Sequence, residues 1–193
     1  LKVNEHADNA PFGIEPPDGY RIKVADKTNR APGEKLGKQL GDPENTRKKG
    51  KANVGDAAPG WTLKDPSGAD VSLADLKGKV VVLDFWGTWC PWCVKAMPQL
   101  QKVYDKYRSR GATVIGLNIE NDPKADPVKF MQRNKFTYGL LLNAEGAVKD
   151  YGVSGFPTLV VVGKDGTVIA REEGYSPDLE KKLGEIIDKA LAK

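Results

Sequence analysis

The chain has 193 residues, of which 39% are hydrophobic and 29% charged, and its formal net charge is +4. This length suits one domain with a substantial core and an additional segment. The longest apolar runs, residues 80–83 and 159–162, are too short to cross a bilayer. The basic cluster at 47–51 has no aromatic residues among its cations, which argues against nucleic-acid binding.

Residues 1–54 differ in composition from the rest of the chain. Pro, Gly, Asn, Asp and Lys dominate, and only residues 20–24 alternate like a strand. We expect a poorly structured tail or linker, or the end of a preceding domain, followed by one domain at 55–193. The chain begins at Leu1 rather than Met and has no signal-peptide apolar region, which indicates a processed or truncated form.

The domain opens with a short strand at 58–63, a turn at 65–68 and extended chain at 71–73. Ser72 is expected to cap a short turn that ends at Leu76. The apolar run at 80–85 is typical of a central strand that is buried on both faces. Apolar positions spaced by three and four then predict a helix at 91–110, kinked at Pro98 and ended by Gly111.

The remaining pattern alternates between strands and helices. We predict a strand at 114–119, a helix at 127–134, a strand at 138–142, a helical turn at 147–151, strands at 158–162 and 167–173 joined by a hairpin turn at 164–166, and a final helix capped by Ser176 with Pro177 at its first position. Such an order indicates an α/β fold with a mixed central sheet and helices on both faces.

Both cysteines of the chain, Cys90 and Cys93, directly follow the predicted central strand. A thiol at Cys90 would lie near the positive end of the helix dipole, which favours the thiolate and lowers the thiol pKa. Cys93 lies one helical turn further on, where its thiol can resolve a mixed disulfide. This arrangement indicates redox chemistry.

Two other uses of a Cys-x-x-Cys pair are less compatible with the sequence. A structural zinc site needs four Cys or His ligands, but the chain has no other cysteine and only one histidine, His6. We therefore expect no metal and no cofactor. A purely structural disulfide would close a very short loop and remove little entropy from the unfolded chain.

The motifs and their order resemble those of the thioredoxin fold. The residues that carry this resemblance are the helix start Trp89-Cys90-Pro91-Trp92-Cys93 and the segment Gly155-Phe156-Pro157-Thr158 before the hairpin. Together with the opening strand and turn, the segments Lys77-Gly78-Lys79-Val80 and Phe85-Trp86-Gly87-Thr88 are more similar to TlpA/ResA-type extracytoplasmic disulfide reductases. The resemblance covers residues 55–193 and implies a thioredoxin-like domain with an N-terminal strand–turn extension.

The resemblance also implies roles for individual residues. Cys90 matches the exposed attacking thiol, and Cys93 matches the buried resolving thiol. Pro157 matches a proline whose preceding peptide bond, from Phe156, is cis and whose backbone receives the substrate beside the dithiol. We expect the substrate to contact Trp89, Pro91, Trp92 and Phe156, with Trp92 on an exposed rim and Trp86 in the core.

Asp84 is the candidate proton acceptor. It lies six residues before Cys90, where thioredoxins carry a buried acid, and burial should raise the pKa of its carboxyl. It would then accept the proton of the Cys93 thiol. TlpA/ResA-type proteins often have a neutral residue here, and the Glu that some carry three residues after the second cysteine is Ala96 in this chain. A solvated Asp at the strand end is the alternative.

The dipeptide between the cysteines leaves the direction of electron flow open. Pro91-Trp92 is closer to glutaredoxins and to oxidising periplasmic oxidoreductases than to ResA-like proteins. Residues at these positions tune the redox potential. The resemblance as a whole favours a reductive role, in cell redox homeostasis or cytochrome c maturation.

The expected enzyme is a monomeric, periplasmic or otherwise extracytoplasmic protein-disulfide oxidoreductase. Its partners would be protein disulfides or dithiols and an upstream redox protein, with a membrane tether outside this chain. A copper-binding or metallocentre-assembly module is an alternative, because soft thiolates suit Cu(I), although only Met97 lies near as a further ligand. A peroxiredoxin is disfavoured, because Gly87 stands where a Thr would be required.

Overall fold

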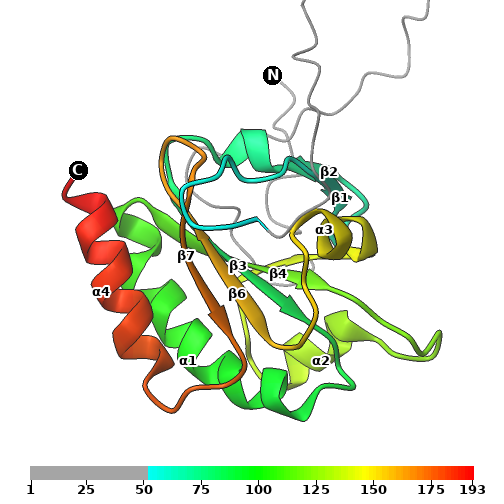
Figure 1. Ribbon diagram of the computed structural model, residues 1–193. Coiled ribbons are helices and arrows are strands. Elements are labelled where there is room, and N and C mark those ends of the chain that lie inside the picture. The colour runs from blue at the N-terminus through cyan, green and yellow to red at the C-terminus, as the bar shows by residue number, and fades with distance from the viewer. Residues whose placement is uncertain (1–51) are drawn as a thin grey trace, which may run out of the picture.

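The computed structural model describes residues 52–193. Its centre is a five-stranded sheet in the order β5-β4-β3-β6-β7 (Figure 1). β3, β4 and β5 run parallel to one another. β6 pairs antiparallel with β3, and β7 pairs antiparallel with β6. The strands span Val80–Trp86 (β3), Ala112–Asn118 (β4), Gly139–Leu141 (β5), Thr158–Val162 (β6) and Val168–Glu173 (β7). The predicted mixed α/β architecture is confirmed.

Helices cover both faces of this sheet. The helices are α1 (Pro91–Tyr107), α2 (Pro127–Arg133), α3 (Glu145–Asp150) and α4 (Leu179–Leu191), with 3-10 turns η1 (Leu73–Leu76) and η2 (Arg108–Arg110). Residues of α1, α2 and α4 pack into one core cluster, and α3 packs into the other with a small hairpin. That hairpin consists of β1 (Thr62–Lys64) and β2 (Asp70–Ser72).

β3 is buried along its whole length, as its apolar sequence predicts. Because successive side chains of a strand point to opposite faces, Val82 and Trp86 join the core beneath α1. Leu83 and Phe85 join the core on the other face, with α3 and the hairpin. The same alternation places Asp84 on the α1 side, between Val82 and Trp86.

The two long helices differ from their predicted bounds at one end each. α1 ends at Tyr107 and is followed by the 3-10 turn η2. Gly111 caps this turn with a φ of 93°, which suits a residue without a Cβ. The prediction that Ser176 caps the last helix is wrong, because α4 begins at Leu179 and its N-cap is Asp178. Ser176 instead accepts a hydrogen bond from the Leu179 amide in a preceding turn.

The first described residues, from Ala52, already pack on the domain before residue 55. Ala52 is buried, and the amides of Gly55 and Ala58 donate to the carbonyl oxygens of Val168 and Gly166 at 2.8 and 2.9 Å. Residues 1–51 of the predicted tail, including the expected strand at 20–24, lie outside the described residues.

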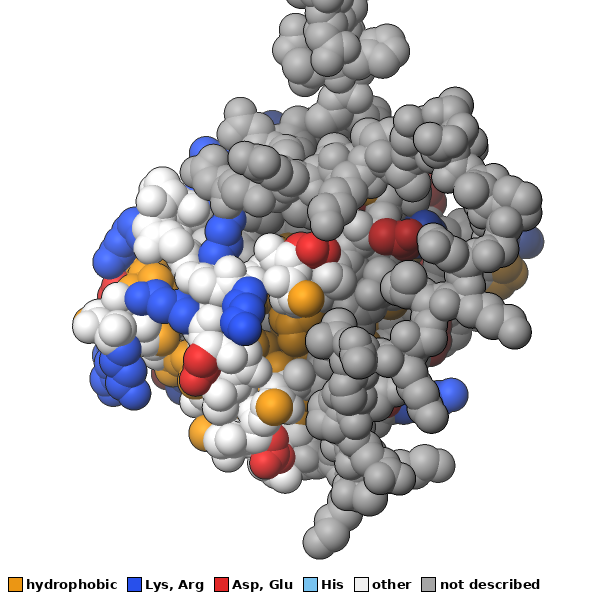
Figure 2. Space-filling model, turned by 90° about the horizontal axis from the view of Figure 1, so that it is seen from above, with side chains coloured by type: hydrophobic (Ala, Val, Ile, Leu, Met, Phe, Trp, Pro, Cys, Tyr) orange, Lys and Arg blue, Asp and Glu red, His pale blue; other side chains and the backbone are white. Residues whose placement is uncertain are grey.

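The surface of the described part is mixed in character. On the face seen from above, basic side chains lie among acidic and hydrophobic ones (Figure 2). Within residues 52–193, no helix combines the length and the apolar composition that crossing a membrane requires.

Candidate active site

The two cysteines lie where β3 passes into α1. Cys90 is the N-cap of α1, Pro91 is its first residue, and the Cys90 Sγ accepts a hydrogen bond from the Cys93 amide at 3.1 Å. Cys90 and Cys93 form a disulfide with their Cα atoms 5.3 Å apart. Only 4% of Cys90 and 1% of Cys93 are exposed, so the expectation of an exposed Cys90 is wrong for this disulfide form: closing the bond to Cys93 leaves both sulfurs buried. The pair thus lies at the positive end of a 17-residue helix.

The loop that leads into Cys90 is held by the end of β4. Thr88 donates its backbone amide and its hydroxyl to the two carboxylate oxygens of Glu120, each at 2.9 Å. Asn118 donates its side-chain amide to Glu120 at 2.8 Å. The Trp89 indole N–H donates to the Ile119 carbonyl oxygen at 3.0 Å. Glu120 belongs to no sequence motif, and its partner Thr88 lies 32 residues away, so no local pattern predicts the pair.

The segment before β6 meets the dithiol at the same end of the sheet. The Phe156–Pro157 bond is cis, which confirms the prediction. Thr158 pairs with Phe85, so Pro157 follows on toward the end of β3 from which the chain enters α1. The Pro157 carbonyl oxygen accepts a hydrogen bond from the Gly174 amide at 2.8 Å.

Two aromatic pairs join the dithiol turn to the segments around Pro157. Trp89 meets Phe156 edge to face, with ring centroids 5.2 Å apart, and Trp92 stacks on Tyr175 at 5.8 Å. Trp89 is 40% exposed and Trp92 is 56% exposed. The prediction of an exposed Trp92 and a buried Trp86 is confirmed, and Pro91 is also exposed.

Asp84 is a buried acid, not a solvated one. Only 1% of the residue is exposed, and burial raises the pKa of its carboxyl from 3.8 to about 8. The Tyr138 hydroxyl donates to Asp84 Oδ2 at 3.5 Å, which partly offsets this rise. Oδ1 has no hydrogen-bond partner among the described residues. Burial and the neighbouring Asp84 also raise the pKa of Tyr138.

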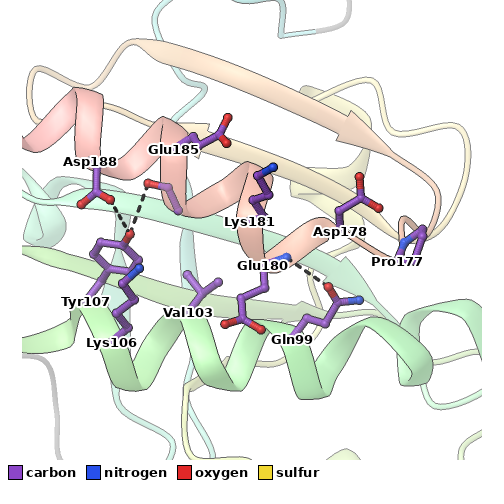
Figure 3. A pocket seen from close by; sticks show the side chains of 11 residues that line it. Gln99, Val103, Lys106, Tyr107, Pro177, Asp178, Glu180, Lys181, Glu185 and Asp188 are labelled. Carbon is purple, nitrogen blue, oxygen red and sulfur yellow. Dashed lines mark hydrogen bonds between the residues drawn. The ribbon is translucent and has the colours of Figure 1, made fainter.

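A groove of about 360 Å³ lies between α1 and α4, apart from the predicted site residues. Its lining includes Gln99, Tyr107 and Asp188 (Figure 3). The Tyr107 hydroxyl donates to Asp188 at 2.9 Å, so the groove contains a hydrogen bond between the two helices.

Among residues 52–193, no group of three or more His, Cys, Asp or Glu side chains is arranged to hold a metal.

Comparison with known proteins agrees with this geometry. The family model described as Redoxin matches residues 53–187. This chain belongs to the redoxin family. The thiol-disulfide oxidoreductase ResA of Bacillus thuringiensis subsp. konkukian is 36% identical over 129 residues, which are 66% of this chain and 73% of the relative. ResA of Geobacillus thermodenitrificans is 35% identical over 116 residues, which are 60% of this chain and 66% of the relative.

Solved structures of thiol-disulfide oxidoreductases and interchange proteins are also similar to this chain. A thiol:disulfide interchange protein from a Bacteroides species is 32% identical with a TM-score of 0.62, over 70% of this chain and 91% of that chain. The thioredoxin domain of a thiol-disulfide oxidoreductase from Bacteroides vulgatus is 30% identical with a TM-score of 0.63, over 70% of this chain and 98% of that chain. The redoxin described here is therefore a thioredoxin-like thiol-disulfide oxidoreductase of ResA type, and its dithiol is Cys90–Cys93.

Proposed function

We propose that this oxidoreductase reduces disulfides of protein substrates outside the cytoplasm, with Cys90 as the attacking thiol. The observation that carries the proposal is the position of Cys90, which caps α1 and accepts the Cys93 amide hydrogen bond. Both features favour a negative charge on its sulfur once the disulfide is reduced. Cys93 has no such position, since it lies within the first turn of the helix rather than at its N-cap.

The reaction proceeds by two exchanges. The Cys90 thiolate attacks one sulfur of the substrate disulfide, which forms a mixed disulfide and releases the first substrate thiolate. Cys93 then loses its proton, and its thiolate attacks the Cys90 sulfur and releases the second substrate thiolate. Two electrons pass to the substrate, and the enzyme is left with the Cys90–Cys93 disulfide. An upstream dithiol partner returns it to the reduced form.

Asp84 is the proposed acceptor for the Cys93 proton. Its carboxyl lies on the α1 side of β3, between Val82 and Trp86, which belong to the same buried cluster as both cysteines. A pKa near 8 suits proton transfer with a thiol at neutral to mildly alkaline pH. A single water molecule would extend its reach if direct contact is not made.

The substrate surface is proposed to consist of Trp89, Pro91, Trp92 and Phe156, with the backbone at Pro157 receiving an extended peptide. The exposure of both tryptophans supports this assignment, because exposed aromatic rings are typical contacts of protein interfaces. The resemblance to ResA-type reductases supports the extracytoplasmic location, a tether outside this chain, and a role in cytochrome c maturation or cell redox homeostasis.

Two measurements test the proposed function. The first is turnover of insulin disulfides with dithiothreitol as reductant, which wild type should catalyse and Cys90→Ser should not. The second is the reduction potential of the Cys90–Cys93 pair in a glutathione buffer. A reductive role predicts a value nearer to the roughly −270 mV of thioredoxin than to the roughly −120 mV of an oxidant such as DsbA. A potential near the latter value would contradict the direction proposed.

A further inference from the structure

One of the two aromatic pairs beside the dithiol carries a cation. The Lys95 Nζ lies 5.2 Å from the centre of the Trp92 ring and 4.8 Å from the centre of the Tyr175 ring. Both distances are within the range of cation–π attraction. Trp92 lies between the two cysteines, and Lys95 lies two residues after Cys93. The ammonium group is therefore held at the rim of the redox site.

The segment that carries Tyr175 is fixed from two sides. The Gln99 side chain on α1 donates to the Ser176 carbonyl oxygen at 3.1 Å. It also accepts from the Glu180 amide at 3.1 Å (Figure 3). The Gly174 amide donates to the Pro157 carbonyl oxygen at 2.8 Å. Tyr175 is thus anchored between α1 and the cis-proline, where the proposed substrate strand would lie. This rim is formed before any substrate arrives.

Within the described part of the protein, the Lys95 ammonium has aromatic partners but no acidic one. Among residues 52–193, it forms no ion pair with a carboxylate, and its side chain is exposed. Glu173, two residues before Tyr175, pairs with Arg171 at 2.9 Å, and Glu180, five residues after it, pairs with Lys102 at 3.4 Å. No cation is found over the other aromatic pair, Trp89 with Phe156, among the same residues. The two sides of the dithiol therefore differ in charge.

Given the proposed exchange with protein disulfides, we propose that Lys95, Trp92 and Tyr175 form a specificity site for an acidic residue close to the substrate's reactive cysteine. The substrate carboxylate binds the Lys95 ammonium, and the apolar part of the same residue covers the Trp92 and Tyr175 rings. The rings hold the lysine in place and exclude part of its water, which strengthens the pair. Neutral side chains on the same substrate segment face the uncharged pair, Trp89 and Phe156.

Matched peptides test this site directly. Two peptide disulfides on a Gly/Ser background, identical except for Glu or Gln at positions within two residues of the reactive cysteine, are compared by kcat/KM. Wild type should prefer a Glu peptide by about fivefold at low salt, the size expected of a partly exposed ion pair, and the preference should fall as salt is added. Lys95→Gln should remove the preference, and Lys95→Glu should reverse it.

Lys106→Gln is the matched control. Lys106 also lies over a tyrosine ring, at 4.9 Å from the centre of Tyr107, on the same helix. It is eleven residues beyond Lys95, or about 16 Å along the axis, so this variant should keep the Glu preference. Equal rates for both peptides in wild type, or a preference that survives Lys95→Gln, would overturn the specificity site while the proposed function stands. Failure of wild type to reduce any peptide or insulin would overturn the function itself.

Discussion

The Tyr138 hydroxyl donates to Asp84 Oδ2 at 3.5 Å, and both residues are buried in the described domain. The bond is long, so it opposes only part of the cost of burying the carboxylate. Burial remains the larger influence and raises the pKa of Asp84 to about 8. The structure thus holds an acid that changes charge in the same pH range as a thiol.

The first prediction concerns stability. Between pH 4 and pH 8 the folded protein retains the Asp84 proton that the unfolded chain has lost, so this residue destabilises the fold increasingly as pH rises. Asp84→Asn removes the effect. In urea unfolding of the oxidised protein, the unfolding free energy of the variant should rise relative to that of wild type by on the order of 5 kcal/mol from pH 4 to pH 8. Asp150→Asn, at an exposed site, is the control, and parallel profiles for Asp84→Asn and wild type would refute the raised pKa.

The second prediction concerns resolution of the mixed disulfide. Asp84→Asn keeps the size of the side chain but removes the proton acceptor, so breakdown of a preformed mixed disulfide should slow by about a hundredfold. Tyr138→Phe keeps the acid but loses the hydrogen bond that lowers its pKa, so the pH profile should move to higher pH. Stopped-flow measurement of breakdown from pH 6 to 9 provides the comparison. Equal rates in Asp84→Asn and wild type throughout would reduce Asp84 to a structural group.

The third prediction concerns Glu120 as a positioning residue. Glu120→Gln replaces one acceptor oxygen with an NH₂ group, so the bonds from Thr88 and Asn118 cannot all be kept. We expect a loss of about 1–3 kcal/mol in unfolding free energy and a changed rate of Cys90 alkylation in the reduced protein. Glu145→Gln, exposed on α3, is the control. An unchanged alkylation rate despite lower stability would limit Glu120 to a structural role.

Much of the fold could be predicted because the sequence signals are local. The apolar runs of β3 and β6 are long enough to identify buried strands, and the Cys-x-x-Cys pair marks the start of α1. The predicted start of α4 at Ser176 is wrong because a contact from another helix decides the local structure there. Gln99, from another helix, bonds the Ser176 carbonyl oxygen and the Glu180 amide and so stabilises a turn where the sequence favours a cap.

The residues of the active site likewise fall into those that a local motif predicts and those that depend on tertiary contacts. Cys90, Cys93 and Pro157 belong to recognisable motifs, whereas Glu120 and Tyr175 act through partners far away in sequence. Tyr175 meets Trp92 across more than 80 positions, and no local pattern predicts that contact. The burial of Asp84 was inferred by resemblance, but its contact with Tyr138 depends on how β5 pairs with β4.

The fourth prediction concerns the N-terminal segment. Residues 1–51 offer few apolar groups, so their deletion should leave the melting temperature and the insulin-reduction rate almost unchanged. Deletion through residue 58 also removes Ala52 and the Gly55 and Ala58 hydrogen bonds, and it should lower the melting temperature by several degrees. Equal melting temperatures for the two deletions, or a large loss from the shorter one, would contradict this division of the chain.

The central claim is that Cys90 attacks the substrate and Cys93 resolves the intermediate. The most direct test is to trap the mixed disulfide between insulin and each single-cysteine variant and to measure its yield by mass spectrometry. Cys93→Ser leaves the attacking thiol but removes the resolving one, so it should accumulate a mixed disulfide through Cys90, whereas Cys90→Ser should accumulate almost none. Accumulation in Cys90→Ser but not in Cys93→Ser would reverse the two roles and contradict the account.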